Sequence, residues 1–413
     1  MFRPVARIAP LLSQANWLTK SRVRAYLVIL AAMLGLAFAS YMATAHDGLD
    51  LLGRPVGPDF ASFWTASQLA LAGQSAEAWN PTAHHAAQIA VFGQGAAYAA
   101  FFYPPPYLLV CLPLALMPYS QALGVWLLAT GLAWVAVTRA WLDAPRDWLA
   151  VLAFPAVLLN IGHGQNGFLT AALLGGAALL NTSRPWLTGV LIGALIIKPH
   201  LAVLTPLFLL LTGNWRAILS AALTVAALCV LSLIVFGPEA WRAFFESSAL
   251  ARLALEQDLV GYAKMQSTFA AARLLGAPLS LAWGLQIVSA LVAIVGLWRV
   301  ARGARDQACG AALVCATLLT TPFLLDYDLI LMGIPLAWLF NRARREGFLA
   351  WEKIALLAGF VLPLVARPLA MSLHLPIAPL VLLGLLTCIH RRVQADRVLD
   401  APLPLLSPQT EPR

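Results

Sequence analysis

"AILSAALTVAALCVLSLIVF", residues 217–236, is an apolar run without a single charged side chain. A helix that crosses the hydrocarbon core of a bilayer needs about 20 such residues. Residues 25–45 and 279–298 meet the same condition. Because only helices and closed barrels satisfy their backbone polar groups in lipid, these stretches predict an all-α protein that crosses the membrane several times.

The composition supports this fold class. The chain has 413 residues, of which 61% are hydrophobic and 11% charged, whereas soluble domains carry about 25% charged residues. The net charge of +9 does not require a nucleic acid partner, since Lys and Arg concentrate in the cytoplasmic loops of membrane proteins. The five cysteines lie in or beside apolar runs. They are expected to pack as small apolar side chains, without a disulfide framework or a metal site.

Hydropathy and charge together predict a topology of about twelve spans. A basic segment, residues 1–24, precedes a transmembrane domain at 25–390, and the tail at 391–413 is expected to be disordered. The arginine clusters near 299–305, 342–345 and 391–397 place both termini in the cytoplasm. The apolar run at 25–45 is too long for a signal peptide, so we expect it to remain as the first span. The predicted spans are 25–45, 119–140, 148–161, 165–180, 186–197, 200–213, 216–236, 279–300, 307–321, 323–341, 348–370 and 376–390.

Three segments outside these spans need a separate interpretation. Residues 103–118 are apolar but rich in proline, and counting them as a crossing would put the arginine clusters outside, so we expect a re-entrant segment. Residues 46–102 and 237–278 form two long outer loops. In the first, Phe60, Phe63, Trp64 and Leu71 have the spacing of one helix face, which predicts a helix on the membrane surface. The His84-His85 pair is expected to be exposed, because adjacent residues do not share a helix face.

Polar residues that are unusual in so apolar a chain all fall on the outer side of this topology. Asp59 lies in the first outer loop, and Tyr103 ends it. Residues 162–166 (GHGQN), 198–200 (KPH) and 326–328 (DYD) lie at the outer ends of predicted spans. Five polar motifs on one face indicate a single active or binding site at the outer leaflet.

Each motif also has a purely structural interpretation. Asp59 suits a helix N-cap, and Lys198 could extend its ammonium from a helix end to the interface. His200 could be an ordinary interfacial histidine, and the glycines of GHGQN could simply form a turn. Asp326 and Asp328 would face the same way in an extended loop and could then bind a divalent cation, but would diverge in a helix.

The motifs occur together in a recognisable order. They are GPDFASFWTASQLALAG, FFYPPPYLLVCLPLALMP, GHGQNGFL, IIKPHLAVLTPLFLL and TTPFLLDYDLILMGIP. This series resembles the polyprenol-phosphate-mannose-dependent α-mannosyltransferases, glycosyltransferase family 87, of the GT-C fold class. The resemblance covers roughly residues 25–389. Met265-Gln266-Ser267 departs from the Asn-Gln-Ser element of the family.

The resemblance implies an inverting hexosyltransferase of the cytoplasmic membrane. Its donor would be a polyprenyl-phosphate sugar, mannose or, as in relatives, arabinofuranose. Its acceptor would be the hydroxyl of a lipid-linked sugar or a glycan. The acid of the first outer loop is the catalytic base in the GT-C class, and Asp59 occupies that position. The tandem acidic pair of metal-dependent members of the class has no equivalent here, so no metal or other cofactor is expected.

The chemistry of this transfer assigns the other polar residues. Lys198, assisted by His200, would stabilise the negative charge that develops on the donor phosphate. Binding of the sugar and the acceptor is assigned to His163, Gln165, Asn166, Tyr103, Trp64, Asp326, Tyr327 and Asp328. Tyr103 and Trp64 would form an apolar wall. Two other classes stay open, a lipid or sugar transporter or flippase, which usually places its polar residues at the bilayer midplane, and a non-catalytic assembly subunit.

Overall fold

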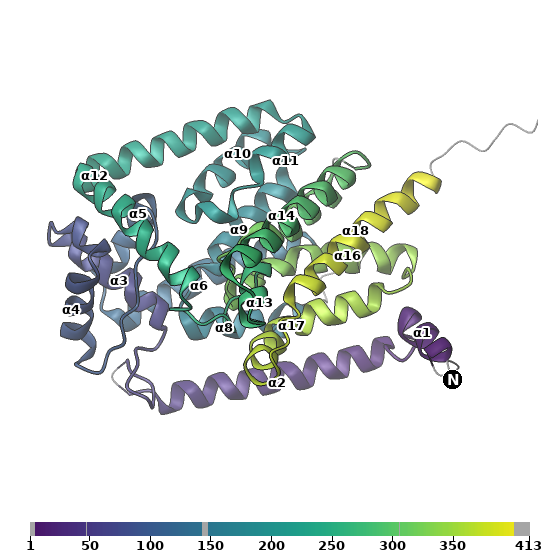
Figure 1. Ribbon diagram of the computed structural model, residues 1–413, viewed down its shortest axis with the longest axis horizontal. Coiled ribbons are helices and arrows are strands. Elements are labelled where there is room, and N and C mark those ends of the chain that lie inside the picture. The colour runs from purple at the N-terminus through teal and green to yellow at the C-terminus, as the bar shows by residue number, and fades with distance from the viewer. Residues whose placement is uncertain (1–4, 47, 143–147, 305, 400–413) are drawn as a thin grey trace, which may run out of the picture.

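The computed structural model describes residues 5–46, 48–142, 148–304 and 306–399 (Figure 1). Every regular element in these ranges is a helix, as the sequence predicts. The α-helices are α1 (Val5–Gln14), α2 (Lys20–Thr44), α3 (Pro58–Leu71), α4 (Pro81–Phe92), α5 (Pro105–Cys111), α6 (Tyr119–Ala140), α7 (Trp148–Leu152), α8 (Ala156–His163), α9 (Gly167–Leu180), α10 (Pro185–Ala194), α11 (Thr205–Thr212), α12 (Trp215–Glu256), α13 (Thr268–Leu274), α14 (Leu279–Ala301), α15 (Gln307–Thr320), α16 (Gly333–Glu346), α17 (Glu352–Leu373) and α18 (Ala378–Leu399). The 3-10 helices are η1 (Ser75–Trp79), η2 (Leu112–Leu116), η3 (Leu195–Ile197), η4 (Pro199–Leu201) and η5 (Asp326–Met332).

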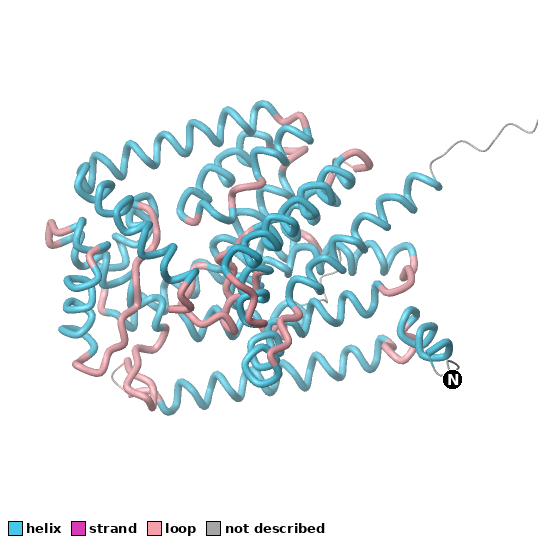
Figure 2. Tube along the Cα trace, in the orientation of Figure 1, coloured by secondary structure: helices cyan, strands magenta, loops and turns pink. Residues whose placement is uncertain are grey.

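The long helices make this a multi-pass membrane protein. Among the described residues, five helices are long and apolar enough to cross a bilayer, namely α2, α6, α12, α14 and α17. Further apolar helices are shorter, and several of the spans predicted by hydropathy correspond to these short or interrupted helices. Helix α2 runs along one edge of the bundle and has no buried residue (Figures 1 and 2). Most of its apolar side chains are therefore exposed, as expected of a helix in contact with lipid, although it touches α7 and α8.

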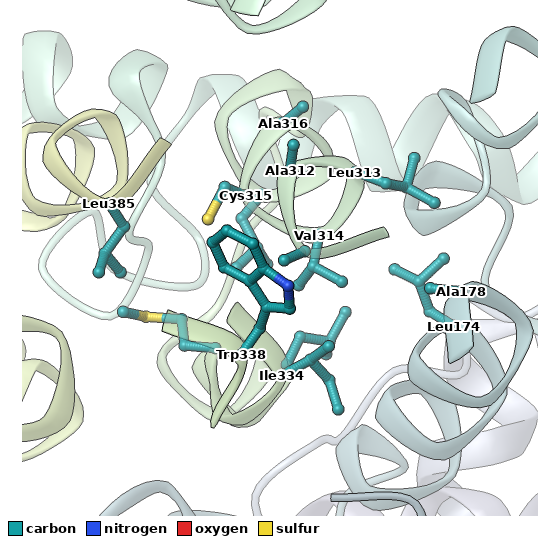
Figure 3. Close-up of a cluster of buried hydrophobic side chains, with 14 of the residues drawn as sticks. Leu174, Ala178, Ala312, Leu313, Val314, Cys315, Ala316, Ile334, Trp338 and Leu385 are labelled. Carbon is teal, nitrogen blue, oxygen red and sulfur yellow. The ribbon is translucent and has the colours of Figure 1, made fainter. Parts of the chain in front are cut away.

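The core of the bundle surrounds α15. All of its residues from Ala308 to Leu319 are buried, including the free thiols of Cys309 and Cys315. Figure 3 shows the ring of Trp338, from α16, lying among side chains of α15 such as Val314 and Cys315. A helix that is buried on every side fixes the position of the segment that follows it. That segment leads directly into η5.

Helix α12 extends across the predicted start of the second outer loop at residue 237. The helix is 42 residues long and bends at Gly237, where φ is 77° and the backbone is not helical. Pro238 follows and cannot donate a backbone hydrogen bond to the preceding turn. The second half of α12 turns back and packs against α5 and η1 (Figure 1). Residues 238–256, the first part of the predicted second outer loop, thus form a helix that leads the chain inward to residues 257–267.

The first outer segment also differs from the prediction. Helix α3 forms where its apolar spacing predicts it, but Phe60 and Phe63 are almost fully buried against the rest of the protein. Leu71 is 46% exposed and lies off that face. The rings of Phe60 and Phe63 contact Trp126 of α6, and Phe63 also contacts Tyr107 of α5. Helix α3 is therefore not a free surface helix, because aromatic side chains of α5 and α6 cover its apolar face.

The arginine-rich helix ends gather at one end of the bundle. Arg342 of α16 pairs with Asp396 of α18 at 2.9 Å. Arg392 of α18 pairs with the buried Glu352 at the start of α17. These ends lie on the same side as the N-terminal helix α1 in Figure 1. Helix α18 continues to Leu399, so the first part of the predicted tail is helical, and residues 400–413 lie outside the described residues.

His84 is buried, contrary to the expectation that the His84-His85 pair is exposed. Its side chain is 0% exposed, and its Nε2 atom lies 3.2 Å from the carbonyl oxygen of Ser62. Burial lowers the pKa of His84 to about 4. The ring fills the contact between α4 and α3, whereas His85 is directed at the carbonyl oxygen of Ala96.

We predict that this histidine makes the protein less stable in mild acid. Below a pH of about 6.5 the unfolded chain binds a proton that the folded state accepts only near pH 4, so stability falls as the pH drops through this window. The expected loss is about 3 kcal/mol at the acidic end. Unfolding in detergent at pH 7.5 and 4.5 measures it. His84→Gln should reduce the pH dependence and His85→Gln should not; equal profiles for both variants would contradict the assignment.

Candidate active site

Asp59 lies in the first turn of α3 but does not cap it. Gly57 is the N-cap residue, with a left-handed backbone (φ 73°), and no side chain caps the helix. Pro58 occupies the first turn, where its missing N–H costs nothing. The carboxylate of Asp59 instead accepts a hydrogen bond at Oδ2 from Nε2 of Gln165, at 3.0 Å. The capping interpretation is therefore wrong, and the side chain is directed at a residue more than 100 positions away.

Two glycines bring these distant segments together. Gly164, with φ 63°, ends α8 and faces Gly57 at the start of α3. A Cβ atom on Gly164 would lie 2.6 Å from Cβ of Phe60 and 3.3 Å from Cα of Gly57. The carbonyl oxygen of Gly164 accepts a hydrogen bond from Nε1 of Trp126 at 3.2 Å. The glycine of the GHGQN motif is thus required for the close approach of the two backbones.

Gln165 is held in one orientation by its neighbours. Its Oε1 atom accepts hydrogen bonds from the hydroxyl of Tyr103 at 3.0 Å and from the backbone N–H of Asn166 at 2.7 Å. The amide group must then direct its N–H groups towards Asp59. Asp59 is only partly buried, and in the described part of the chain its Oδ1 atom accepts no hydrogen bond. One oxygen is positioned by Gln165, while the other is available to a proton donor.

Lys198 and Asp328 form a buried ion pair beside this chain of contacts. Nζ of Lys198 lies 2.5 Å from Oδ1 of Asp328, and the two side chains are 3% and 0% exposed. Nζ also donates to Oδ1 of Asn166 at 3.3 Å. The backbone N–H of Leu325 donates to Oδ2 of Asp328 at 3.3 Å. The pair joins the turn between η3 and η4 to the start of η5, and Asn166 connects both to Gln165.

Tyr327 lies close to two lysines. Its ring centroid is 5.1 Å from Nζ of Lys198 and 5.4 Å from Nζ of Lys264. The ring of His163 is 5.6 Å away, centroid to centroid. Asn160 fixes the backbone by donating from Nδ2 to the carbonyl oxygen of Tyr327 at 2.8 Å. Lys264 was not identified from the sequence, although it directly precedes the Met265-Gln266-Ser267 stretch that the resemblance singles out.

These contacts define one group of side chains, which we call the polar cluster. Its members come from five separate segments, and each lies where a helix begins or ends; Figure 2 shows loop segments that meet near α8 and α13. Tyr103 reports the local electrostatics: burial raises its pKa well above the usual value, and the nearby carboxylates of Asp59 and Asp328 raise it further. The polar cluster consists of Asp59, Tyr103, His163, Gln165, Asn166, Lys198, Tyr327 and Asp328.

Three of the residues assigned to the site do not take part in these contacts. Trp64 donates from Nε1 to the carbonyl oxygen of Met117 at 3.1 Å and stabilises the fold of the outer segment. Asp326 is directed at Arg367, with its Oδ2 3.5 Å from Nη1. The carbonyl of His200 accepts from Thr321, while its buried Nε2 atom has no partner in the described part of the chain.

The two carboxylates of the DYD motif diverge. Residues 326–332 form the 3-10 helix η5, so Asp326 faces Arg367 whereas Asp328 faces Lys198. They cannot chelate one cation in this arrangement. Within the described ranges, no group of three or more His, Cys, Asp or Glu side chains has a geometry suited to a metal ion.

We predict that Gly164→Ala weakens both folding and the contact between Asp59 and Gln165. The added methyl group meets Cβ of Phe60 at 2.6 Å, and the left-handed backbone disfavours alanine. Gly162→Ala is the matched control, because a Cβ there has no neighbour within 4 Å. Thermal unfolding in detergent should show a clear loss for Gly164→Ala alone. Equal stability of the two variants would contradict the close approach of α3 and the GHGQN turn.

We predict strong coupling between Lys198 and Asp328. Removal of one partner leaves a buried unpaired charge, which costs about 3–5 kcal/mol, whereas removal of both costs much less. Lys198→Met and Asp328→Leu should each lower the unfolding temperature strongly, and the double variant should recover part of the loss. Additive losses in the double variant would show that the two groups do not interact in the folded protein.

Comparison with known proteins identifies the family of the chain. A profile of glycosyltransferase family 87 matches residues 101–323, a range that contains Tyr103, the GHGQN turn, Lys198 and Lys264 and ends just before the DYD motif. No curated protein and no solved structure matches the chain. The match spans more than half of the sequence and includes most of the segments that build the polar cluster. The chain belongs to glycosyltransferase family 87.

Proposed function

We propose that this glycosyltransferase transfers mannose from a polyprenyl phosphate to a hydroxyl of a lipid-linked or glycan acceptor. The reaction would take place on the outer side of the cytoplasmic membrane, with both termini in the cytoplasm. The gathering of the arginine-rich helix ends opposite the outer segment supports this orientation, because cytoplasmic loops carry most Lys and Arg.

The observation that carries the proposal is the position of Asp59. One of its oxygens is fixed by the Gln165–Tyr103 chain, and the other has no partner in the described part of the chain. The acceptor oxygen would attack C1 of the sugar while its proton passes to Asp59. The bond between C1 and the phosphate oxygen breaks, and its electron pair leaves with the polyprenyl phosphate. Attack opposite the leaving group inverts the anomeric centre.

Unsatisfied buried groups next to the ion pair support a polar ligand there. Nδ2 of Asn166 and Nε2 of His200 are buried without a hydrogen-bond partner in the described part of the chain. Such groups are rare in folded proteins, and hydroxyl or phosphate oxygens of a substrate would satisfy them. We therefore assign Lys198 and His200 to the donor phosphate, and His163, Asn166 and Asp328 to sugar hydroxyls.

An apolar groove supports a lipid-linked donor. A cavity of about 440 Å³ lies between α10, α11 and α12 and is lined almost entirely by apolar side chains. Pro199, directly after Lys198, lines it together with Ile196 and Ala202. Its chemistry suits an isoprenoid chain whose phosphate lies beside Lys198.

Two further assignments remain part of this proposal. A polyprenyl-phosphate arabinose donor is the alternative sugar source, as the resemblance implies. Catalysis without a metal ion is proposed from the divergence of Asp326 and Asp328 and from the position of Asp59 as base. A flippase or transporter would need none of the positioning that Gln165 gives to Asp59.

We predict that Asp59→Asn abolishes transfer, with a loss of at least 10²–10⁴-fold, the usual contribution of a general base. The assay uses purified protein in detergent, labelled polyprenyl-phosphate mannose and a lipid extract from the host. Glu77→Gln, in the same outer segment, is the matched control and should turn over as wild type does. Near-wild-type turnover by Asp59→Asn would remove Asp59 from the mechanism. Should the wild type be inactive with this donor, the arabinose donor is tested next.

A further inference from the structure

The phosphate of a lipid-linked donor needs a positive charge that the buried ion pair does not fully supply. The ammonium of Lys198 is 2.5 Å from the carboxylate of Asp328, and both side chains are excluded from solvent. The pair is close to neutral as a unit. A second anion placed beside it would gain less net attraction than beside an unpaired lysine, and a large shift of Lys198 towards that anion would leave Asp328 unpaired in a buried site.

Lys264 presents the unbalanced charge next to this pair. Its side chain is partly exposed, and in the described part of the chain its Nζ atom has no carboxylate partner. This atom lies 5.4 Å from the ring centroid of Tyr327. The ring of Tyr327 thus lies close to both ammonium groups, one paired and buried and the other unpaired and accessible.

The backbone around Lys264 is firmly attached to the segment that carries Tyr327 and Asp328. The carbonyl oxygen of Lys264 accepts from the N–H of Asp326 at 3.1 Å. The N–H of Gln266 donates to the carbonyl oxygen of Leu324 at 2.7 Å, so the two segments form a short antiparallel bridge. Gln266 is 4% exposed, and the next residue caps helix α13. A lysine on this bridge has a fixed base, unlike a lysine on a free loop.

The other nearby cations are already engaged. Arg367 extends towards Asp326, at 3.5 Å. Arg273 donates to the hydroxyl of Tyr262 at 3.1 Å and to the carbonyl oxygen of Ala277 at 2.8 Å. Lys264 alone of these three has neither a carboxylate nor a carbonyl partner for its charged group among the described residues.

We infer that Lys264 binds the phosphate of the lipid-linked donor and stabilises the charge that develops there as the sugar leaves. The inference rests on the proposed function, since it takes the donor to be a prenyl phosphate sugar. Lys198, which also holds Asp328 and Asn166 in place, contacts the phosphate as proposed above, while Lys264, which has no carboxylate partner among the described residues, contacts it from beside the ring of Tyr327. The second outer segment, through the bridge between residues 264–266 and 324–326, becomes part of the donor site.

A binding experiment tests this role without requiring turnover. A short-chain prenyl phosphate and the corresponding prenyl alcohol are titrated into purified wild type, Lys264→Gln and Lys264→Arg, with binding followed by calorimetry. A charge-assisted hydrogen bond contributes enough that Lys264→Gln should bind the phosphate about 10–100-fold more weakly. Binding of the alcohol should not change, and Lys264→Arg should keep most of the affinity. Lys353→Gln, on α17, is the matched control.

The outcomes separate the inference from the proposed function. Binding of the phosphate by wild type with equal affinity in Lys264→Gln would overturn the role of Lys264 and leave the proposed function standing. Failure of wild type to bind the phosphate would overturn the prenyl phosphate donor, and the inference with it. Parallel losses for the phosphate and the alcohol would show a structural role only. The unfolding temperature of Lys264→Gln should equal that of wild type.

Discussion

The buried ion pair between Lys198 and Asp328 is the interaction on which the site depends. Each partner alone would be costly at this depth, so the η3–η4 turn and the start of η5 must stay together. Asn166 also binds Lys198, and Gln165 next to it binds Asp59. A displacement of either ion would therefore shift Asn166 and Gln165 and, through Gln165, the carboxylate of Asp59 on α3. The pair sets the geometry of the site. Because the pair is close to neutral, a further positive charge, which we propose is that of Lys264, would bind the donor phosphate.

The interrupted helices explain how so apolar a chain contains so polar a centre. Short elements such as α8, η3 and η5 end inside the protein, where their backbone groups and flanking side chains face one another. Non-helical backbone at membrane depth is tolerated only where protein or a cavity covers it. The all-buried α15 supplies that cover and leads the chain into η5. The interruptions that shorten these helices and make them harder to identify by hydropathy are therefore the points at which the residues of the polar cluster lie.

Much of the site could be predicted from the sequence, because charged and amide side chains stand out in an apolar chain. Asp59, Tyr103, Gln165, Asn166, Lys198 and Asp328 converge as the topology required. The pairing of Lys198 with Asp328 could not be foreseen, since it depends on the 3-10 turn of η5 that separates Asp328 from Asp326. The proximity of Lys264 to the site could not be predicted, because a lysine is common in an outer loop and its spatial neighbours are not evident from the sequence. The exposure expected of His84 and the surface position assigned to α3 were wrong, because the sequence places residues on a helix face but does not show what covers that face, while the role assigned to Trp64 stays a prediction.

The most direct test of the account is to follow the fate of a labelled donor in vesicles. Purified protein is reconstituted into vesicles with a lipid acceptor extract and with polyprenyl-phosphate mannose that is labelled in its mannose. The account predicts that the label leaves the donor and appears in a new product with inverted anomeric configuration. The amount of free polyprenyl phosphate released should equal the amount of labelled product formed. Label that stays on intact donor while the donor changes leaflet would contradict it and identify a carrier instead.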